Sequence, residues 1–300
     1  MVAERREDQG MFEGFEWVRI EAEGASINSV RGGEGPPVLL LHGYPQTLAM
    51  WHLVAPRLAE RFTIVATDLR GYGDSSKPEG GEDHGGYSKR AMALDQVWVM
   101  RELGFDSFAV VGHDRGGRVA HRMALDHPER VEKLAVLDIV PTRHVFGTAD
   151  TNLATAYYHW FFLIQPYDLP EHLIGTDPDY YLGKKLAAWS ANAGVFDPDA
   201  YAEYARCFRD PKTIHASCED YRAAATIDLV HDEADRGRRV ECPLLVLWGE
   251  KGVVYRLYDP LEVWRGYASE VGGRALPCGH FLAEEKPKET ADELVSFLES

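Results

Sequence analysis

Short runs of apolar residues, each ended by a turn, recur along the chain. The runs lie at 38–41, 62–67, 108–111, 134–137 and 244–247. Apolar side chains on both faces of such a short run are typical of buried strands in a parallel sheet. Segments of helical length separate the first four runs, for example 88–104 and 116–127. This alternation predicts βαβ units and an α/β fold with a mostly parallel sheet flanked by helices.

The alternation stops after Pro141 and resumes only near Val240. The stretch between these residues has no buried-strand pattern but has segments of helical character at 150–165, 177–193 and 198–207. The sequence therefore predicts a helical insertion in the α/β fold.

We expect this insertion, 142–236, to form a cap domain on a core domain made of 1–141 and 237–300. The insertion carries 15 of the 33 aromatic residues of the chain. Aromatic rings at this density suit a lid that closes over a pocket and excludes water from it. A small helical core within the insertion is the plainer explanation and accounts for most of these rings.

Length, composition and charge narrow the class of protein. A chain of 300 residues can bury one large α/β core together with an insertion. With 45% hydrophobic residues, a mean hydropathy of -0.30 and no long apolar run, we expect a soluble protein without a membrane span. The net charge of -16 disfavours nucleic acid and anionic membranes as partners.

The cysteines and the N-terminus bear on the compartment. Four cysteines are far apart in the sequence and form no CxxC pair, so we expect free thiols and no zinc or redox site; they are Cys207, Cys218, Cys242 and Cys278. Residues 1–8 are charged and no apolar segment follows them, which does not match a signal peptide. A cytoplasmic protein is the expectation.

The most informative turn joins the apolar run 108–111 to the next helical segment. It reads Gly112-x-Asp114-x-Gly116, the form of the nucleophile elbow G-x-S-x-G with Asp in place of Ser. Glycines are needed on both sides because the turn is too tight for side chains. A helix N-terminus beneath Asp114 favours an anion there. The pattern indicates a carboxylate nucleophile.

A carboxylate nucleophile forms an ester that water must then cleave, so a base is required. His280 lies in a loop before the last helical segment, where a hydrolase of this architecture carries its catalytic histidine. Two acids could orient it: Glu250, just after the run 244–247, and Asp138, which ends the run 134–137. We favour Asp138 because the carboxyl ends of parallel strands face one crevice.

These residues have a family resemblance. The whole chain resembles the α/β-hydrolase superfamily and, within it, the fluoroacetate (haloacetate) dehalogenases. The matching motifs lie at 42–47, 68–75, 113–118, 137–139, 158–160, 218–222 and 279–281. The first two motifs are shared with epoxide hydrolases and haloalkane dehalogenases. The Asp-Arg-x-x-Arg motif at 114–118 and the pair His159-Trp160 are the more specific ones.

The resemblance implies a role for each matching residue. It makes Asp114 the nucleophile, His280 the base and Asp138 the partner of that base. It makes Arg115 and Arg118 a clamp for the substrate carboxylate, and two guanidinium groups on one helical turn can hold a carboxylate while screening it from Asp114.

The resemblance also assigns a halide pocket and an oxyanion hole. His159, Trp160 and Tyr221 match the halide pocket, where imidazole, indole and phenol groups donate hydrogen bonds to the leaving anion. The backbone N–H groups of Tyr44 and Arg115 match the oxyanion hole. Trp189 could line the entrance to the site.

The predicted activity is hydrolytic dehalogenation of short 2-haloacids, converting fluoroacetate and water to glycolate and fluoride through an ester of Asp114. The resemblance implies no metal, no cofactor and a homodimer. An epoxide hydrolase is the first alternative, with Tyr158 and Tyr221 protonating the epoxide oxygen. A small-molecule receptor on the same fold is the second.

Overall fold

The computed structural model describes residues 10–192 and 194–300. The charged segment 1–8 and the last residue of the predicted helix 177–193 lie outside these described residues. Within them, no helix combines the length and the apolar character needed to cross a bilayer. All four cysteines are free thiols.

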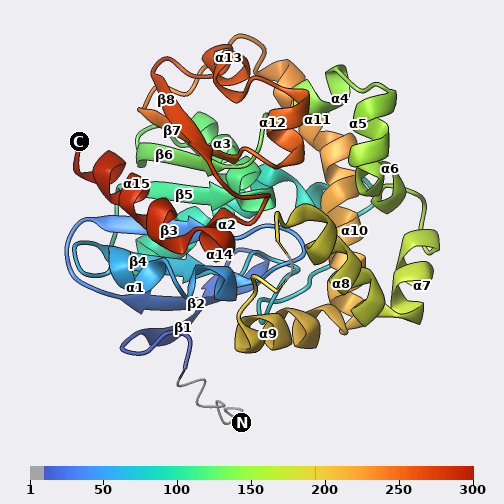
Figure 1. The fold of residues 1–300 in the computed structure, drawn as a ribbon, viewed down its shortest axis with the longest axis horizontal. Coiled ribbons are helices and arrows are strands. Elements are labelled where there is room, and N and C mark those ends of the chain that lie inside the picture. The colour runs from blue at the N-terminus through green and yellow to red at the C-terminus, as the bar shows by residue number, and fades with distance from the viewer. Residues whose placement is uncertain (1–9, 193) are drawn as a thin grey trace.

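A sheet of eight strands runs through the described part of the molecule in the order β1-β2-β4-β3-β5-β6-β7-β8 (Figure 1). The strands are β1 (Glu16–Ala22), β2 (Ala25–Gly32), β3 (Pro37–Leu41), β4 (Thr63–Thr67), β5 (Phe108–His113), β6 (Val131–Leu137), β7 (Leu244–Gly249) and β8 (Val271–Leu276). Strand β2 pairs antiparallel with β1 and β4, and every other neighbouring pair is parallel. The predicted mostly parallel sheet is confirmed.

The five apolar runs are the five consecutive strands β4-β3-β5-β6-β7. Every residue of β4, β5 and β7 is buried, as the apolar side chains on both faces require. Of the remaining strands, β1 and β8 are the two edges of the sheet and β2 lies between β1 and β4, and no apolar run marked these three strands in the sequence.

Helices outside the insertion cover both faces of the sheet. Figure 1 shows α14 and α15 in front of the sheet and α2 and α3 behind it, and α2 packs along α3. The helices outside the insertion in the described residues are η1 (Leu48–Trp51), α1 (Ala55–Leu58), η2 (Gly85–Tyr87), α2 (Lys89–Glu102), α3 (Arg115–Asp126), α12 (Val253–Leu257), α13 (Pro260–Arg265), α14 (Leu282–Glu285) and α15 (Pro287–Glu299).

The helical insertion lies between β6 and β7 and gathers on one side of the sheet (Figure 1). Its helices are α4 (Thr142–Gly147), α5 (Thr151–Ala156), α6 (Tyr158–Leu163), α7 (Leu169–Thr176), α8 (Pro178–Trp189), α9 (Pro198–Phe208), α10 (Pro211–Ala225) and α11 (Ile227–Ala234). Eleven positions of α10 are buried, and one apolar cluster continues from the sheet into the insertion. The insertion therefore shares the core of the sheet.

One predicted helix differs from the structure. The segment 150–165 is two short helices, α5 and α6, because Tyr157 between them has ψ of 35° and leaves the helical conformation. In α6, His159, Trp160 and Leu163 are buried. The single continuous helix expected from the sequence is therefore wrong in this segment.

Candidate active site

Asp114 occupies the sharp turn between β5 and α3. Its φ of 46° is a conformation that residues other than glycine rarely adopt. A Cβ atom on Gly112 would lie 2.4 Å from the carbonyl oxygen of Gly116. A Cβ atom on Gly116 would lie 2.3 Å from the carbonyl oxygen of His42. Only glycine fits at these two positions, so the Gly-x-Asp-x-Gly pattern follows from the close packing of this turn.

The Asp114 side chain is buried and held as an anion. The backbone N–H of Tyr44 donates to its Oδ1 at 3.0 Å. Burial raises the pKa of the Asp114 carboxyl. The charges of His280 and Arg118, with smaller contributions from His113 and Arg115, lower this pKa by more than burial raises it, so the pKa lies below the ordinary value. A buried, ionised carboxylate at the start of a helix is suited to attack an electrophilic carbon.

His280 and Asp138 form a hydrogen-bonded pair beside this carboxylate. The two groups meet at 2.6 Å between His280 Nδ1 and Asp138 Oδ2, while the backbone N–H of Gly249 donates to Asp138 Oδ1 at 3.0 Å. Glu250, the other acid considered from the sequence, is exposed. The structure therefore brings Asp138 to His280 and leaves Glu250 at the surface.

Opposing effects set the pKa of His280. Burial lowers it, but the hydrogen bond to Asp138 and the charges of Asp138 and Asp114 outweigh burial and raise the pKa above the ordinary value. Loss of the Asp114 charge would remove one of the causes that raise this pKa. Without that charge, a larger fraction of His280 would be neutral at a given pH.

Arg115 is fully buried and held by a residue of the insertion. Its Nε donates to Asp220 Oδ2 at 2.9 Å, and its Nη2 donates to Asp220 Oδ1 at 2.6 Å and to the Asp220 carbonyl oxygen at 2.8 Å. Tyr72 and Lys89 also donate to the Asp220 carboxylate. Arg115 Nη1 is enclosed without a partner. Three of the hydrogen bonds to Asp220 thus fix the guanidinium and leave one nitrogen for a ligand.

Arg118 lies one turn further along α3. Its Nη1 donates to the carbonyl oxygen of Val140 at 2.6 Å, and its Nε is enclosed without a partner. Arg115 and Arg118 each therefore offer an unpaired buried N–H near the Asp114 carboxyl group, and the charges of both arginines lower its pKa. Two such donors suit a small carboxylate, which accepts bonds on both oxygens.

His159, Trp160 and Tyr221 come together from α6 and α10. The ring of Tyr221 lies 5.7 Å from that of His159 and 5.8 Å from that of Trp160. The Arg115 guanidinium lies 4.2 Å from the Tyr221 ring centroid. His159 Nδ1 and Tyr221 Oη are enclosed without partners. Burial and nearby positive charges hold the pKa of His159 well below its ordinary value, so its imidazole is neutral.

Trp189 and Tyr158 lie in different surroundings. Trp189 is half-buried, with its ring 4.6 Å from His159 and 5.4 Å from His280, so it forms a wall beside both. Tyr158 is 51% exposed, and its ring covers the ammonium of Lys185. An exposed phenol engaged with a lysine is poorly placed to protonate a bound epoxide.

Sequence reasoning gave no role to Asp220, Lys89 or Tyr72, which together hold Arg115 in place. Asp220 lies inside the matched segment 218–222, so the sequence did contain a signal for it. The pairing itself joins residues 105 positions apart and depends on the helical phase of α10. No pattern of local spacing reveals such a contact.

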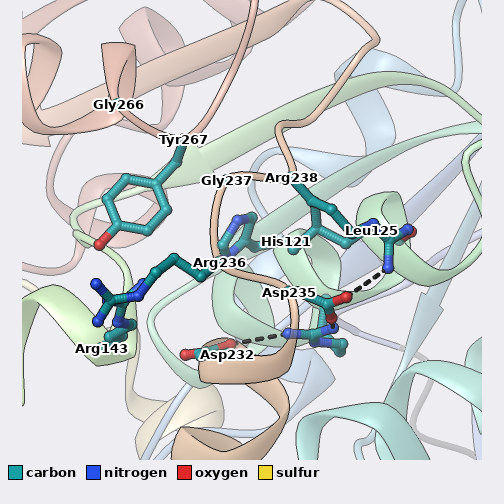
Figure 2. A pocket seen from close by; sticks show the side chains of 11 residues that line it. His121, Leu125, Arg143, Asp232, Asp235, Arg236, Gly237, Arg238, Gly266 and Tyr267 are labelled. Atoms are coloured by element: carbon teal, nitrogen blue, oxygen red, sulfur yellow. Dashed lines mark hydrogen bonds and ion pairs between the residues drawn. The ribbon is translucent and has the colours of Figure 1, made fainter.

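A pocket of about 210 Å³ lies beside the C-terminal half of α3, away from Asp114 (Figure 2). Arg122 on α3 is held there by Asp232 and Asp235, and Arg238 donates to Asp235 and to the carbonyl oxygen of Leu125. These arginines already have partners within the protein. In the described residues, no cluster of three or more His, Cys, Asp or Glu side chains is arranged to hold a metal ion.

Comparisons with known proteins place the chain among hydrolases. The family described as alpha/beta hydrolase fold matches residues 36–287. The chain is 51% identical, over 96% of its own length and 95% of the relative's, to a fluoroacetate dehalogenase of Burkholderia sp.. It is 36% identical, over 91% and 94%, to a soluble epoxide hydrolase of Corynebacterium sp. (strain C12). The crystal structure of ALR0039 from Nostoc sp. PCC 7120 is 60% identical, covers 96% of this chain and 99% of its own, and superposes with a TM-score of 0.95.

Proposed function

The chain belongs to the α/β-hydrolase fold family, and from this membership and the geometry of the site we propose that it is a hydrolytic dehalogenase of short 2-haloacids. Fluoroacetate is the leading substrate, with glycolate and fluoride as products. The observation that carries the proposal is an ionised Asp114 next to two buried arginines, each with an unpaired N–H. Similarity to a fluoroacetate dehalogenase supports the same assignment.

Substrate binding places one anion beside another. Arg115 Nη1 and Arg118 Nε donate to the two oxygens of the haloacid carboxylate. Their positive charges offset its repulsion by Asp114, and a neutral epoxide would leave both of these donors unpaired. Asp220 keeps Arg115 in position during this step, because it holds the opposite edge of the guanidinium.

Displacement of the halide comes next. A carboxylate oxygen of Asp114 forms a bond to the α-carbon while the carbon–halogen bond breaks and its electron pair leaves with the halide. Tyr221 Oη and an N–H of His159 donate to the departing anion, together with the indole N–H of Trp160. Donors that meet charge as it develops lower the barrier most, and fluoride accepts hydrogen bonds strongly.

Hydrolysis of the ester completes the cycle. His280 removes a proton from water as the water oxygen attacks the ester carbonyl carbon of Asp114, and Asp138 stabilises the resulting imidazolium. The Tyr44 N–H, 3.0 Å from Asp114 Oδ1, donates to the developing oxyanion. The N–H of Arg115 is the second donor, because the first residue of a helix has no partner within it. As the intermediate collapses, the ester C–O bond breaks and the imidazolium gives its proton to the departing glycolate oxygen. The second proton of the attacking water is released to solvent, which restores the Asp114 carboxylate.

The direct test measures fluoride released from fluoroacetate by the purified protein. Wild-type protein is expected to release fluoride, and Asp114→Ala to release none. In His280→Gln, the first step remains but water is not activated, so mass spectrometry of the intact protein should detect the carboxymethyl ester of Asp114. A chiral 2-halopropionate should give lactate of inverted configuration. Fluoride release that survives Asp114→Ala would refute the mechanism.

Epoxide hydrolysis is the second candidate function. The enclosed, unpartnered Oη of Tyr221 favours it, because such a phenol could protonate an epoxide oxygen after attack by Asp114. The relative from Corynebacterium is a soluble epoxide hydrolase. Turnover of styrene oxide in the absence of any turnover of haloacetates would establish this function in place of the first.

The wider organisation of the protein is part of the proposal. We assign 142–236 to a cap domain and 1–141 with 237–300 to the core domain, since α4 to α11 follow one another between β6 and β7. The resemblance to haloacetate dehalogenases supports a homodimer, which light scattering of the purified protein tests. The four free cysteines are consistent with a cytoplasmic location.

A further inference from the structure

Buried positive charges in the described residues fall into two groups. Seven Lys and Arg side chains are buried. Five of them pair with Asp or Glu within 4 Å, namely Arg70, Lys89, Arg115, Arg122 and Arg222. Arg118 and Lys185 have no such ion pair. Since a buried charge is costly without a counter-charge, each of the two is suited to receive an anion from outside. Arg118 already has that role in the proposed reaction.

Lys185 is surrounded by aromatic rings. It lies on α8, is only 3% exposed, and its Nζ is 3.6 Å from the ring centroid of Tyr158 and 5.3 Å from that of Trp189. Ring faces stabilise an ammonium group but do not neutralise it. Burial lowers the pKa of Lys185 to about 7, as expected where no acid compensates. Its Nζ is not among the completely enclosed polar atoms that lack a partner, so this nitrogen keeps a small contact with solvent.

The position of Lys185 is between the surface and the site. On one side its neighbour Tyr158 is 51% exposed. On the other side Trp189 lies against His159 and His280, with ring centroids 4.6 Å and 5.4 Å away. The charge of Lys185 also lowers the pKa of His159. The Trp189 ring therefore contacts both this ammonium and His159, one of the halide-binding residues of the proposed reaction.

We propose that Lys185 forms a second anion subsite at the entrance, which takes the carboxylate of an incoming haloacid before Arg115 and Arg118 receive it. This inference rests on the proposed function. A protein with a net charge of -16 repels a small anion at a distance, and a cation at the entrance opposes that repulsion locally. A lysine offers a point charge without a rigid fork, so it holds a carboxylate less firmly than two arginines and can pass it on.

The neighbouring Lys184 provides a matched control. Lys184 is exposed on the same helix, and its Nζ lies 5.4 Å from the ring centroid of Tyr180. Lys184→Met and Lys185→Met remove the same charge from adjacent positions. Steady-state kinetics with fluoroacetate at low and high ionic strength are measured for both variants and for Lys185→Arg, after melting curves confirm that each folds. If Lys185→Met does not fold, Lys185→Gln takes its place.

We expect Lys185→Met to lower kcat/KM about tenfold at low salt while kcat changes little, because the loss concerns capture of the substrate. Its kcat/KM should depend less on salt than that of the wild type. Lys185→Arg should keep most of the wild-type value, and Lys184→Met should match the wild type. Equal losses in the two Met variants, or a loss in kcat as large as that in kcat/KM, would overturn the proposal.

Direct binding separates this inference from the proposed function. Calorimetric titration with acetate needs no turnover, so it is informative even if the wild type releases no fluoride. Acetate should bind Lys184→Met and wild type alike and Lys185→Met more weakly. Unchanged acetate binding in Lys185→Met would overturn the subsite. So would a loss of bromide binding with acetate binding intact, because the occupant would then be a halide.

Discussion

Substitution of Asp220 by Asn tests whether a residue of the insertion holds the carboxylate clamp together. Asn has the same shape but no charge. It can keep the backbone contact from Arg115 Nη2 to the residue 220 carbonyl oxygen, which is 2.8 Å long. It loses one of the two acceptor oxygens that meet Arg115 at 2.9 Å and 2.6 Å. The buried cations of Arg115 and Lys89 then share no counter-charge at this position.

The contacts give the size of the effect. Two charge-assisted hydrogen bonds contribute about 1.5–3 kcal/mol each. Removal of one partner from a buried ion pair costs about 3–5 kcal/mol, since the remaining charge stays buried. We therefore expect Asp220→Asn to lower the free energy of unfolding by about 3–5 kcal/mol. A guanidinium that is no longer fixed should also raise KM for fluoroacetate more than it lowers kcat.

Urea unfolding compares two aspartates that each accept hydrogen bonds from Nε and Nη2 of one arginine. Asp179 accepts from Nε and Nη2 of Arg209, each at 2.8 Å, but both side chains are exposed. Urea unfolding of Asp179→Asn should give a much smaller loss, because solvent screens that pair. The denaturant slope should stay the same in both variants. If Asp220→Asn loses no more stability than Asp179→Asn, the buried charge does not hold the clamp.

Two further outcomes concern the base. Asp138→Asn should lower kcat by about 10³- to 10⁴-fold, because His280 loses the acceptor that fixes its tautomer, whereas Glu250→Gln should match the wild type in the same fluoride assay. The pKa of His280, followed by NMR, should lie above 6.5 in the wild type and fall in Asp114→Asn, because the Asp114 charge is one cause that raises it. Because the pKa of His280 is higher in the folded protein than in the unfolded chain, its protonation stabilises the fold at pH values below the unfolded-state pKa. This stabilisation is lost as the pH rises through the folded-state pKa. An unchanged His280 pKa in Asp114→Asn would show that Asp114 does not influence the base.

The five consecutive strands β4-β3-β5-β6-β7 could be predicted from the sequence, whereas β1, β2 and β8 could not. Strands with both faces covered must be apolar on both faces, which makes an unmistakable run. Strand β2 is mostly buried yet carries Asn28 and Ser29, and Asn28 is buried because its amide donates to Asp68 at 2.8 Å. Strand β8 alternates between exposed and half-buried positions. Such strands are stabilised by distant partners, which no local pattern shows.

The site shows the same division. The position of Asp114 was predictable because the sharp turn that holds it imposes glycines two positions away on either side, which is a local constraint. Asp138 was favoured over Glu250 because it ends a strand of the parallel sheet, and the structure places it against His280 although the two residues are 142 positions apart. The pairing of Asp220 with Arg115 depends on how α10 lies against α3. Residues fixed by a local turn or by strand order could be predicted from the sequence. The contact between Arg115 and Asp220 could not, because it depends on how two distant helices pack.

The Arg115–Asp220 contact also bears on how such an enzyme changes during evolution. The proposed nucleophile, its base and the proposed oxyanion donors all follow strands of the sheet, whereas the rings proposed to bind halide and the residue that anchors Arg115 come from the insertion. Under the proposed mechanism, sequence changes in α6 and α10 would therefore alter which bond is broken while hydrolysis of the ester persists. An engineer who exchanges 142–236 for the insertion of another family member should transfer Asp220 with it, or supply a new anchor for Arg115.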